Sequence, residues 1–174
     1  FAQSSADKKS FFIEKLLQDM TLDEKIGQMT LFTSDWAVTG PTMRDTYKQD
    51  IKTGKTGAIF NAYTVDYVRE LQRIAVEETR LKIPLIFGYD VIHGHRTIFP
   101  IPLGQSCSWD LKAVENAARI AASEASAEGL NWTFAPMVDI ARDPRWGRIA
   151  EGAGEDTYLG SKMAYAQVKG YQGN

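Results

Sequence analysis

Apolar residues along this chain occur in two patterns, short continuous runs and longer stretches with helical spacing. Continuous runs bounded by glycine, proline or polar residues predict buried strands, which we place at residues 29–33, 58–60, 84–88 and 133–138. Apolar residues three or four positions apart predict amphipathic helices, which we place at residues 10–20, 41–52, 65–81, 110–128 and 158–172. Strands and helices therefore alternate, as is typical of an α/β fold with a parallel sheet.

Polar and special residues at the helix ends support these boundaries. Thr21 and Glu24 have the spacing of a capping box, in which each side chain accepts a hydrogen bond from the backbone of the other residue. Asp110 can cap the helix that begins after it, and Gly129 can end that helix. Pro41 lies near the start of its predicted helix, where proline is well tolerated. Residues 91–108 lack such signals and are predicted to form a long loop.

Two architectures satisfy this order, an open doubly wound sheet and a (β/α)8 barrel. A barrel needs about 250 residues and eight strands, and these 174 residues supply about four βα units, or half of one. In both architectures the functional groups lie at the carboxyl ends of the strands. Polar or aromatic residues follow all four predicted strands, among them Trp36, Tyr63, Asp90 and residues 139–148.

Composition narrows the function classes. The chain is 44% hydrophobic and 24% charged with a net charge of −2, which is ordinary for a globular domain. The near-neutral charge argues against a nucleic-acid partner, and no apolar run is long enough to span a membrane. One cysteine, Cys107, excludes an internal disulfide, and we expect it to be a buried small residue. No cofactor is indicated. Residues 1–5 could follow a cleaved secretory signal, although an arbitrary boundary explains them equally well.

Asp90 and Trp36 are candidate ligand contacts because each comes directly after a predicted strand. A carboxylate at position 90 can accept hydrogen bonds from two neighbouring hydroxyls of one sugar, and such charge-assisted bonds are strong. The alternative for Asp90 is a structural role, capping loop amides or pairing with an arginine. The ring of Trp36 could stack on a sugar face, and the alternative is ordinary packing.

The segment after the last predicted strand carries three arginines and several acids. A guanidinium presents a planar fork of donors to carboxylates or vicinal hydroxyls. We expect most of these charges to bind one another and hold the loop, and only one arginine to reach a ligand. The residues expected to pair are Arg142, Asp143, Arg145, Glu155 and Asp156.

His93 and His95 have the spacing of the histidine pair found in some metal-dependent hydrolases, with Asp90 as a possible third ligand. This spacing alone is a weak signal because the chain has no other histidine. We therefore favour hydrogen bonding within the loop for both histidines and predict no metal site.

Four ordered motifs resemble glycoside hydrolase family 3, and most closely its bacterial periplasmic β-glucosidases. They are MTLDEKIGQM at 20–29, DVIHGH at 90–95, TIFPIPLG at 97–104 and APMVDIARDPRWGR at 135–148, the last continuing to Glu155 and Asp156. The likeness covers residues 14–174. Ala153 departs from it, standing where the family has an aromatic residue.

The resemblance implies the first half of a (β/α)8 barrel, which in the family precedes an α/β sandwich domain. Residues 1–26 would form an N-terminal segment with the first helices, and residues 27–174 the half-barrel. By the family pattern, Asp90 and Arg148 hold hydroxyls of the innermost sugar. The resemblance places the lysine–histidine pair, the nucleophilic aspartate and the acid/base glutamate beyond residue 174, so that no catalytic residue is expected in this chain. Glu151 and Glu155 are not expected to replace them.

The predicted activity of the full-length protein is that of a retaining exo-β-glucosidase, with this chain inactive by itself. Specificity for xylosides or N-acetylglucosaminides is the alternative within the family, and a non-catalytic sugar-binding half-barrel is the alternative outside it. A half-barrel leaves two strand edges unpaired. We therefore expect its partner to be the remaining part of the enzyme or a second copy. The family also suggests a periplasmic or secreted location.

Overall fold

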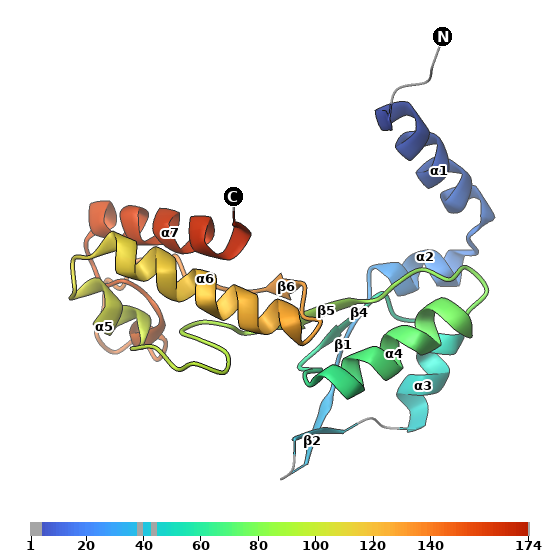
Figure 1. The fold of residues 1–174 in the computed structure, drawn as a ribbon, viewed down its shortest axis with the longest axis horizontal. Helices are drawn as coiled ribbons and strands as arrows, with labels where there is room; N and C mark the ends of the chain where they lie inside the picture. The colour runs from blue at the N-terminus through green and yellow to red at the C-terminus, as the bar shows by residue number, and fades with distance from the viewer. Residues whose placement is uncertain (1–4, 38–39, 43–44, 174) are drawn as a thin grey trace. The chain divides into compact units, whose positions relative to one another are not determined.

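The computed structural model describes the backbone of residues 5–37, 40–42 and 45–173 and the side chains of residues 8–34 and 46–173. Two compact units are present. The first comprises Phe1–Ala62 and Arg69–Ile86, and the second comprises Tyr63–Val68 and Phe87–Asn174. Figure 1 labels the elements of both.

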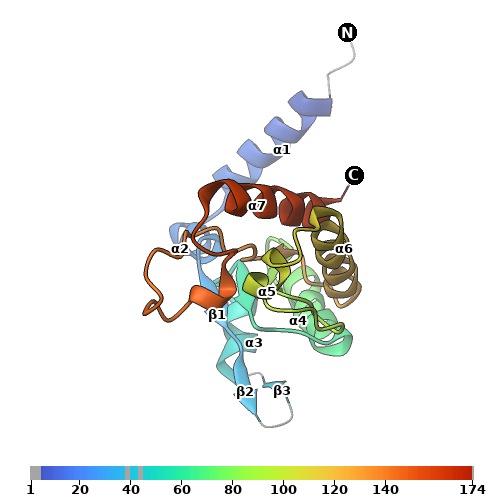
Figure 2. The ribbon, with the colours of Figure 1, turned by 90° about the vertical axis from the view of Figure 1, so that its left-hand side faces the viewer.

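The first unit contains three helices of its own and most of a fourth. These are α1 (Ser5–Asp19), α2 (Leu22–Gln28), α3 (Asp45–Lys52) and α4 (Val65–Glu77), which begins in the second unit. Its strands are β1 (Leu31–Thr33), β2 (Asp35–Ala37), β3 (Gly40–Thr42) and β4 (Ala58–Phe60). Strands β2 and β3 form an antiparallel hairpin, which Figure 2 shows. The core of the unit includes the fully buried side chains of Ile51, Ile59, Leu71 and Ile74.

The second unit contains the remaining elements. They are β5 (Ile86–Tyr89), whose first residue belongs to the first unit, α5 (Pro102–Ser106), α6 (Leu111–Ala127), β6 (Trp132–Thr133), the 3-10 turn η1 (Ile149–Glu151) and α7 (Thr157–Gln172). Helices α6 and α7 lie side by side in both ribbon views (Figures 1 and 2). Val114, Met163 and Ala166 form the buried cluster between these helices. A Cβ at Gly170 would lie 2.4 Å from the Glu115 carbonyl oxygen, so only glycine permits this close approach.

The predicted α/β fold with a parallel sheet is confirmed. Strands β1, β4, β5 and β6 form a sheet in that order. The β1–β4 and β5–β6 pairs are both parallel. The capping box at α2 is also confirmed, with Thr21 N donating to Glu24 Oε2 at 2.8 Å and Glu24 N donating to Thr21 Oγ1 at 3.2 Å. Asp110 caps α6 as expected by accepting from the amides of Lys112 and Ala113.

Three boundaries predicted from the sequence are wrong. Pro41 lies in β3 and not in the first turn of a helix, because a two-stranded ribbon tolerates a residue that cannot donate. The predicted loop 91–108 contains the short helix α5, which begins at Pro102. The strand predicted at 133–138 is paired only at Trp132–Thr133. Pro136 offers no amide to extend that ladder. Among the described residues no helix is long and apolar enough to cross a membrane.

Candidate functional site

Asp90 follows the last residue of β5 and has an exposed side chain. Its carboxylate forms no hydrogen bond or ion pair with any described residue. The backbone after it is nevertheless held, because Tyr171 Oη donates to the Val91 carbonyl and Val91 N lies 3.4 Å from Thr133 Oγ1. Asp90 is therefore a solvent-facing acceptor on a fixed backbone. The alternative roles, capping loop amides or pairing with an arginine, are not what the structure shows.

Arg148 immediately precedes η1 and binds the carboxylate of Glu151. Its Nη2 and Nε atoms lie 2.7 and 3.1 Å from Glu151 oxygens. The hydrogen bonds that Arg148 donates to Glu151 raise the pKa of Arg148, and the negative charges of Glu151, Asp139 and Asp90 act in the same direction. Arg148 and Asp90 thus lie within electrostatic reach of each other inside the second unit. The Nη1 atom of Arg148 makes no hydrogen bond to the described residues and can donate to a ligand.

Asp139 is a neighbour of Arg148 that sequence reasoning did not single out. It is exposed and contributes to the field at Arg148 together with Asp90. The available signal was its position directly after an apolar run, which is the same signal that marked Asp90. These groups together suit a ligand rich in hydroxyl groups, because carboxylates accept where the guanidinium donates.

The predicted pairing among the other loop charges holds in part. Arg145 Nη2 binds Asp143 Oδ2 at 2.5 Å, as expected. Asp156 instead caps α7, accepting from Leu159 N at 2.6 Å. Arg142 and Glu155 form no ion pair with the described residues, so for them the expected pairing is wrong. The side-chain contacts that hold the loop include one local ion pair, one helix cap and the Arg148–Glu151 contact.

The expected hydrogen bonding within the loop is confirmed for His93 but not for His95. His93 Nδ1 lies 2.9 Å from the Phe99 carbonyl oxygen, and the Phe99 amide donates back to the His93 carbonyl at 2.8 Å. His95 faces the carboxylate of Glu128 at 3.0 Å. No group of three or more metal-ligating side chains is found among the residues whose placement is described.

Two further predictions concern Trp36 and Cys107. The backbone of Trp36 lies in β2, but its side chain is outside the described residues. Cys107, expected to be buried, is exposed. It is the residue at which α5 ends, and its apolar side chain contributes no core packing.

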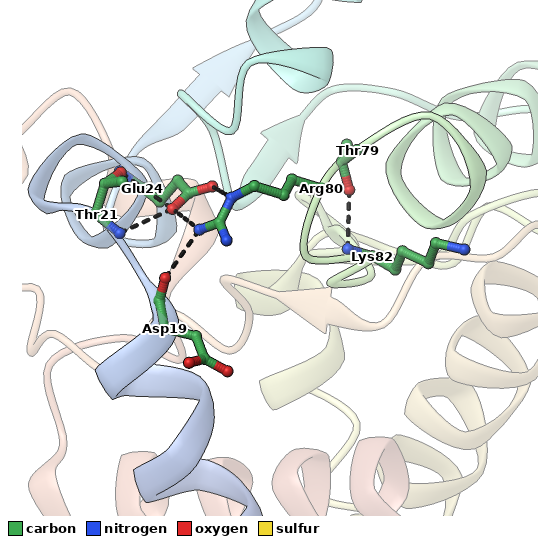
Figure 3. Close-up of polar contacts among 6 residues, drawn as sticks. All are labelled: Asp19, Thr21, Glu24, Thr79, Arg80 and Lys82. Atoms are coloured by element: carbon green, nitrogen blue, oxygen red, sulfur yellow. Dashed lines mark hydrogen bonds and ion pairs between the residues drawn. The ribbon is translucent and has the colours of Figure 1, made fainter.

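A pocket of about 310 Å³ lies elsewhere, in the first unit. The charged groups in its wall are already paired. Glu24 and Arg80 bind each other through two hydrogen bonds (Figure 3), and Lys52 binds Glu78 at 2.7 Å. The hydrogen bonds from Arg80, with help from the Thr21 amide, lower the pKa of Glu24 to about 2. These polar groups hold helices together, and we do not assign a ligand to the pocket.

Comparison with known proteins places this site in a family. Residues 21–174 match the profile described as the glycosyl hydrolase family 3 N terminal domain. A periplasmic beta-glucosidase of Salmonella typhimurium is 49% identical over 96% of this chain and 21% of its own length. A beta-xylosidase of Formosa agariphila is 30% identical over 68% of this chain and 18% of its own length.

A solved structure extends the likeness to the fold. The beta-glucosidase of Listeria innocua in complex with gluconolactone is 38% identical, has a TM-score of 0.83, and is matched over 95% of this chain and 24% of that one. The same enzyme carrying a D270A substitution has been solved with laminaribiose. This chain spans about a quarter or less of the length of these relatives. A match from residue 21 to 174 and 49% identity to one member are decisive, and the chain belongs to glycosyl hydrolase family 3.

Proposed function

We propose that this chain is part of a longer retaining exo-β-glucosidase that releases terminal β-linked glucose. Residues 1–26 would be an N-terminal segment with the first helices, and residues 27–174 the first half of a (β/α)8 barrel. The alternation of parallel strands and helices supports this, as does the chain's coverage of only 21% of its Salmonella relative. The remaining part of the enzyme, or a second copy, would cover the open strand edges. A periplasmic or secreted location is proposed from the same relative.

The observation that carries the proposal is the unpartnered carboxylate of Asp90 at the end of β5, within electrostatic reach of Arg148. Asp90 would accept hydrogen bonds from two adjacent hydroxyls of the glucose ring, and Arg148 would donate to a third oxygen through its free Nη1. The sugar contact predicted for Trp36 from the sequence stays a prediction, because its side chain is outside the described residues. Two groups of opposite charge orient a neutral sugar without attracting other ions strongly.

The chemical step needs two carboxylates, one as nucleophile and one as acid/base, about 5–5.5 Å apart in a retaining enzyme. We assign neither to this chain. Glu151 is engaged by Arg148, and Glu155 lies in the same loop without a role in binding. The part proposed here is to bind and orient the sugar, so that its anomeric carbon meets groups supplied by the rest of the protein. This chemistry requires no metal or organic cofactor.

The sugar accepted in the innermost subsite differs among members of the family. The Listeria enzyme was solved with gluconolactone and laminaribiose, which favours glucose as the sugar in the innermost subsite. The Formosa beta-xylosidase keeps a pentose as the alternative. A panel of aryl β-glycosides carrying glucose, xylose or N-acetylglucosamine, tested on the full-length protein, would decide between these specificities. The highest kcat/KM is expected for the glucoside.

Two experiments separate the enzyme from a sugar-binding half-barrel. The 174-residue chain alone should not hydrolyse an aryl β-glucoside, whereas the full-length protein should. Calorimetry with glucose would then compare the native chain with Asp90→Ala. Turnover by the isolated chain would contradict our assignment of the catalytic carboxylates to other segments. Glucose binding without hydrolysis by the full-length protein would favour the non-catalytic alternative.

A further inference from the structure

Glu128 is a buried carboxylate at the carboxyl end of α6, and its side chain is only 8% exposed. Three groups from two other segments of the second unit meet it. Arg96 Nε donates at 2.5 Å, the Thr64 amide donates at 3.2 Å, and His95 Nε2 lies 3.0 Å away. The His95 nitrogen is a close neighbour of the carboxylate but is not hydrogen-bonded to it.

Glu128 is ionised in this setting. Burial acts to raise its pKa, but contacts with His95 and Arg96 and the hydrogen bond from the Thr64 amide outweigh burial, and the pKa lies below its usual value. A buried anion is tolerated only when it is paired and hydrogen-bonded. The proposed sugar contacts do not include Glu128. The sequence marked it only as the last residue before Gly129.

The contacts of Glu128 lead to Asp90 through one aromatic ring. The His95 imidazole packs edge-on against the Tyr89 ring, with centroids 5.6 Å apart. Tyr89 also packs against Tyr63, at 5.4 Å, and it directly precedes Asp90 in the chain. Because the Asp90 carboxylate forms no hydrogen bond or ion pair with the described residues, its position depends on its backbone and on how firmly Tyr89 is held.

A second acid on α6 fixes the same loop one turn earlier. Glu124 accepts from the amides of Arg96 and Thr97, both at 2.8 Å, and from Thr97 Oγ1 at 2.6 Å. The loop after Asp90 is thus tied to α6 by backbone and side-chain contacts together. Glu128 differs from Glu124 because it alone contacts the imidazole that packs on Tyr89.

We propose that Glu128 is a positioning residue, which orients Asp90 for sugar binding through His95 and Tyr89. The inference rests on the proposed sugar contact of Asp90. Binding sites require their contacting groups to be held within about 0.5 Å by neighbours whose own rotamers are fixed. Tyr171 and Thr133 hold the backbone after Asp90 through Val91. The network of Glu128, His95 and Tyr89 supplies such support on the side before it.

The test is kcat/KM of the full-length protein on an aryl β-glucoside. Glu128→Gln keeps the shape of the side chain but removes the charge, and we expect a loss of about tenfold, because small displacements of binding groups are costly. Glu115→Gln is the matched control. Glu115 is on the same helix and pairs with Lys112 and Lys169, and its carboxylate forms no hydrogen bond or ion pair with residues 89–97. Its substitution should leave kcat/KM unchanged.

A double-mutant cycle distinguishes positioning from a general loss of structure. If Glu128 acts through Asp90, Glu128→Gln should have little further effect in an Asp90→Asn background. Equal losses in both backgrounds, or no loss in either, would overturn the inference. Should Glu128→Gln fail to fold, Arg96→Gln serves in the same cycle, since Arg96 is 64% exposed, and a smaller loss that also vanishes with Asp90→Asn is expected. If the folded full-length protein does not hydrolyse the aryl β-glucoside, the proposed function is wrong, and this inference fails with it.

Discussion

The carboxylates of Glu24 in the first unit and Asp90 in the second have opposite surroundings. Glu24 accepts hydrogen bonds from the Thr21 backbone and hydroxyl and from Nε and Nη2 of Arg80 (Figure 3). Arg80 Nη2 also donates to the Asp19 carbonyl at 2.9 Å, which ties the ends of α1 and α2 to the segment after α4. Asp90 has no such partner among the described residues.

This difference separates charges that hold the fold from charges that are available to a ligand. A carboxylate whose acceptor sites are filled by the protein cannot bind a sugar without breaking those bonds. An exposed carboxylate on a fixed backbone exchanges only water for sugar hydroxyls. Arg148 lies between these cases, because Glu151 occupies Nε and Nη2 but leaves Nη1 free. If function follows this division, substitution of an available charge should lower activity, and substitution of a charge already bound within the fold should lower stability instead.

The largest effect is expected for Asp90→Ala. Two charge-assisted hydrogen bonds, each contributing about 1.5–3 kcal/mol, would be lost. The kcat/KM of the full-length protein on an aryl β-glucoside should therefore fall by a factor on the order of 10² to 10⁴. Asp143→Ala is the control, because Asp143 is an acid of the second unit whose partner is the exposed Arg145. Similar losses in both variants would mean that an unpartnered acid is no better a guide to the site than a paired one.

Arg148→Ala should lower kcat/KM more than Arg145→Ala does. The two arginines share a loop, and each binds one nearby acid. Only Arg148 is proposed to donate to sugar, so its loss should lower kcat/KM by about tenfold to hundredfold. The loss of Arg145 should change it by less than about threefold, as for other exposed pairs. The reverse order of effects would assign the sugar contact to Arg145.

The division between structural and available charges could be predicted from the sequence only in part. The capping box at Thr21 and Glu24 was predictable because both partners lie within one turn. The position of Asp90 was predictable from the apolar run before it. Arg148 was chosen among three arginines by the family resemblance alone. Its bond to Glu151 and the contact of Arg80 with Glu24 depend on how the chain folds, and spacing did not indicate either of them.

The helices of the second unit could also be predicted from the sequence only in part. Amphipathic spacing located α6 and α7 within one or two residues because their caps are side chains next to the helix. Helix α5 was missed because Pro100, Pro102 and Gly104 suggest a loop, although proline at a first helical position is a known start signal. The exposure of Cys107 follows from its place at the end of that unexpected helix.

A moderate effect on stability, without loss of activity, is expected for Thr21→Ala. The substitution removes the side-chain cap of α2 and should lower the free energy of unfolding by about 1 kcal/mol. Urea unfolding of the 174-residue chain would measure it. Thr53→Ala is the control, since the Thr53 hydroxyl donates to carbonyls of the preceding helix α3 and caps no helix start. A fall in kcat/KM of the full-length protein for Thr21→Ala would show that the hydrogen bonds among Thr21, Glu24 and Arg80 also affect the sugar-binding site.

The smallest effect is the pH dependence carried by Glu24, whose pKa is lowered from 4.5 to about 2, chiefly by Arg80. A carboxyl group with a depressed pKa in the folded state stabilises the fold above its unfolded pKa and loses that contribution as the pH falls. The difference in unfolding free energy between the native chain and Glu24→Gln should therefore be constant above about pH 5 and shrink towards pH 2. Other paired carboxylates titrate in both proteins, so their contributions largely cancel in the difference. Because Arg80 is 55% exposed, added salt should also reduce the difference. A difference independent of both pH and salt would show that Glu24 acts through its shape and cap alone, and that the ion pair with Arg80 does not stabilise the first unit.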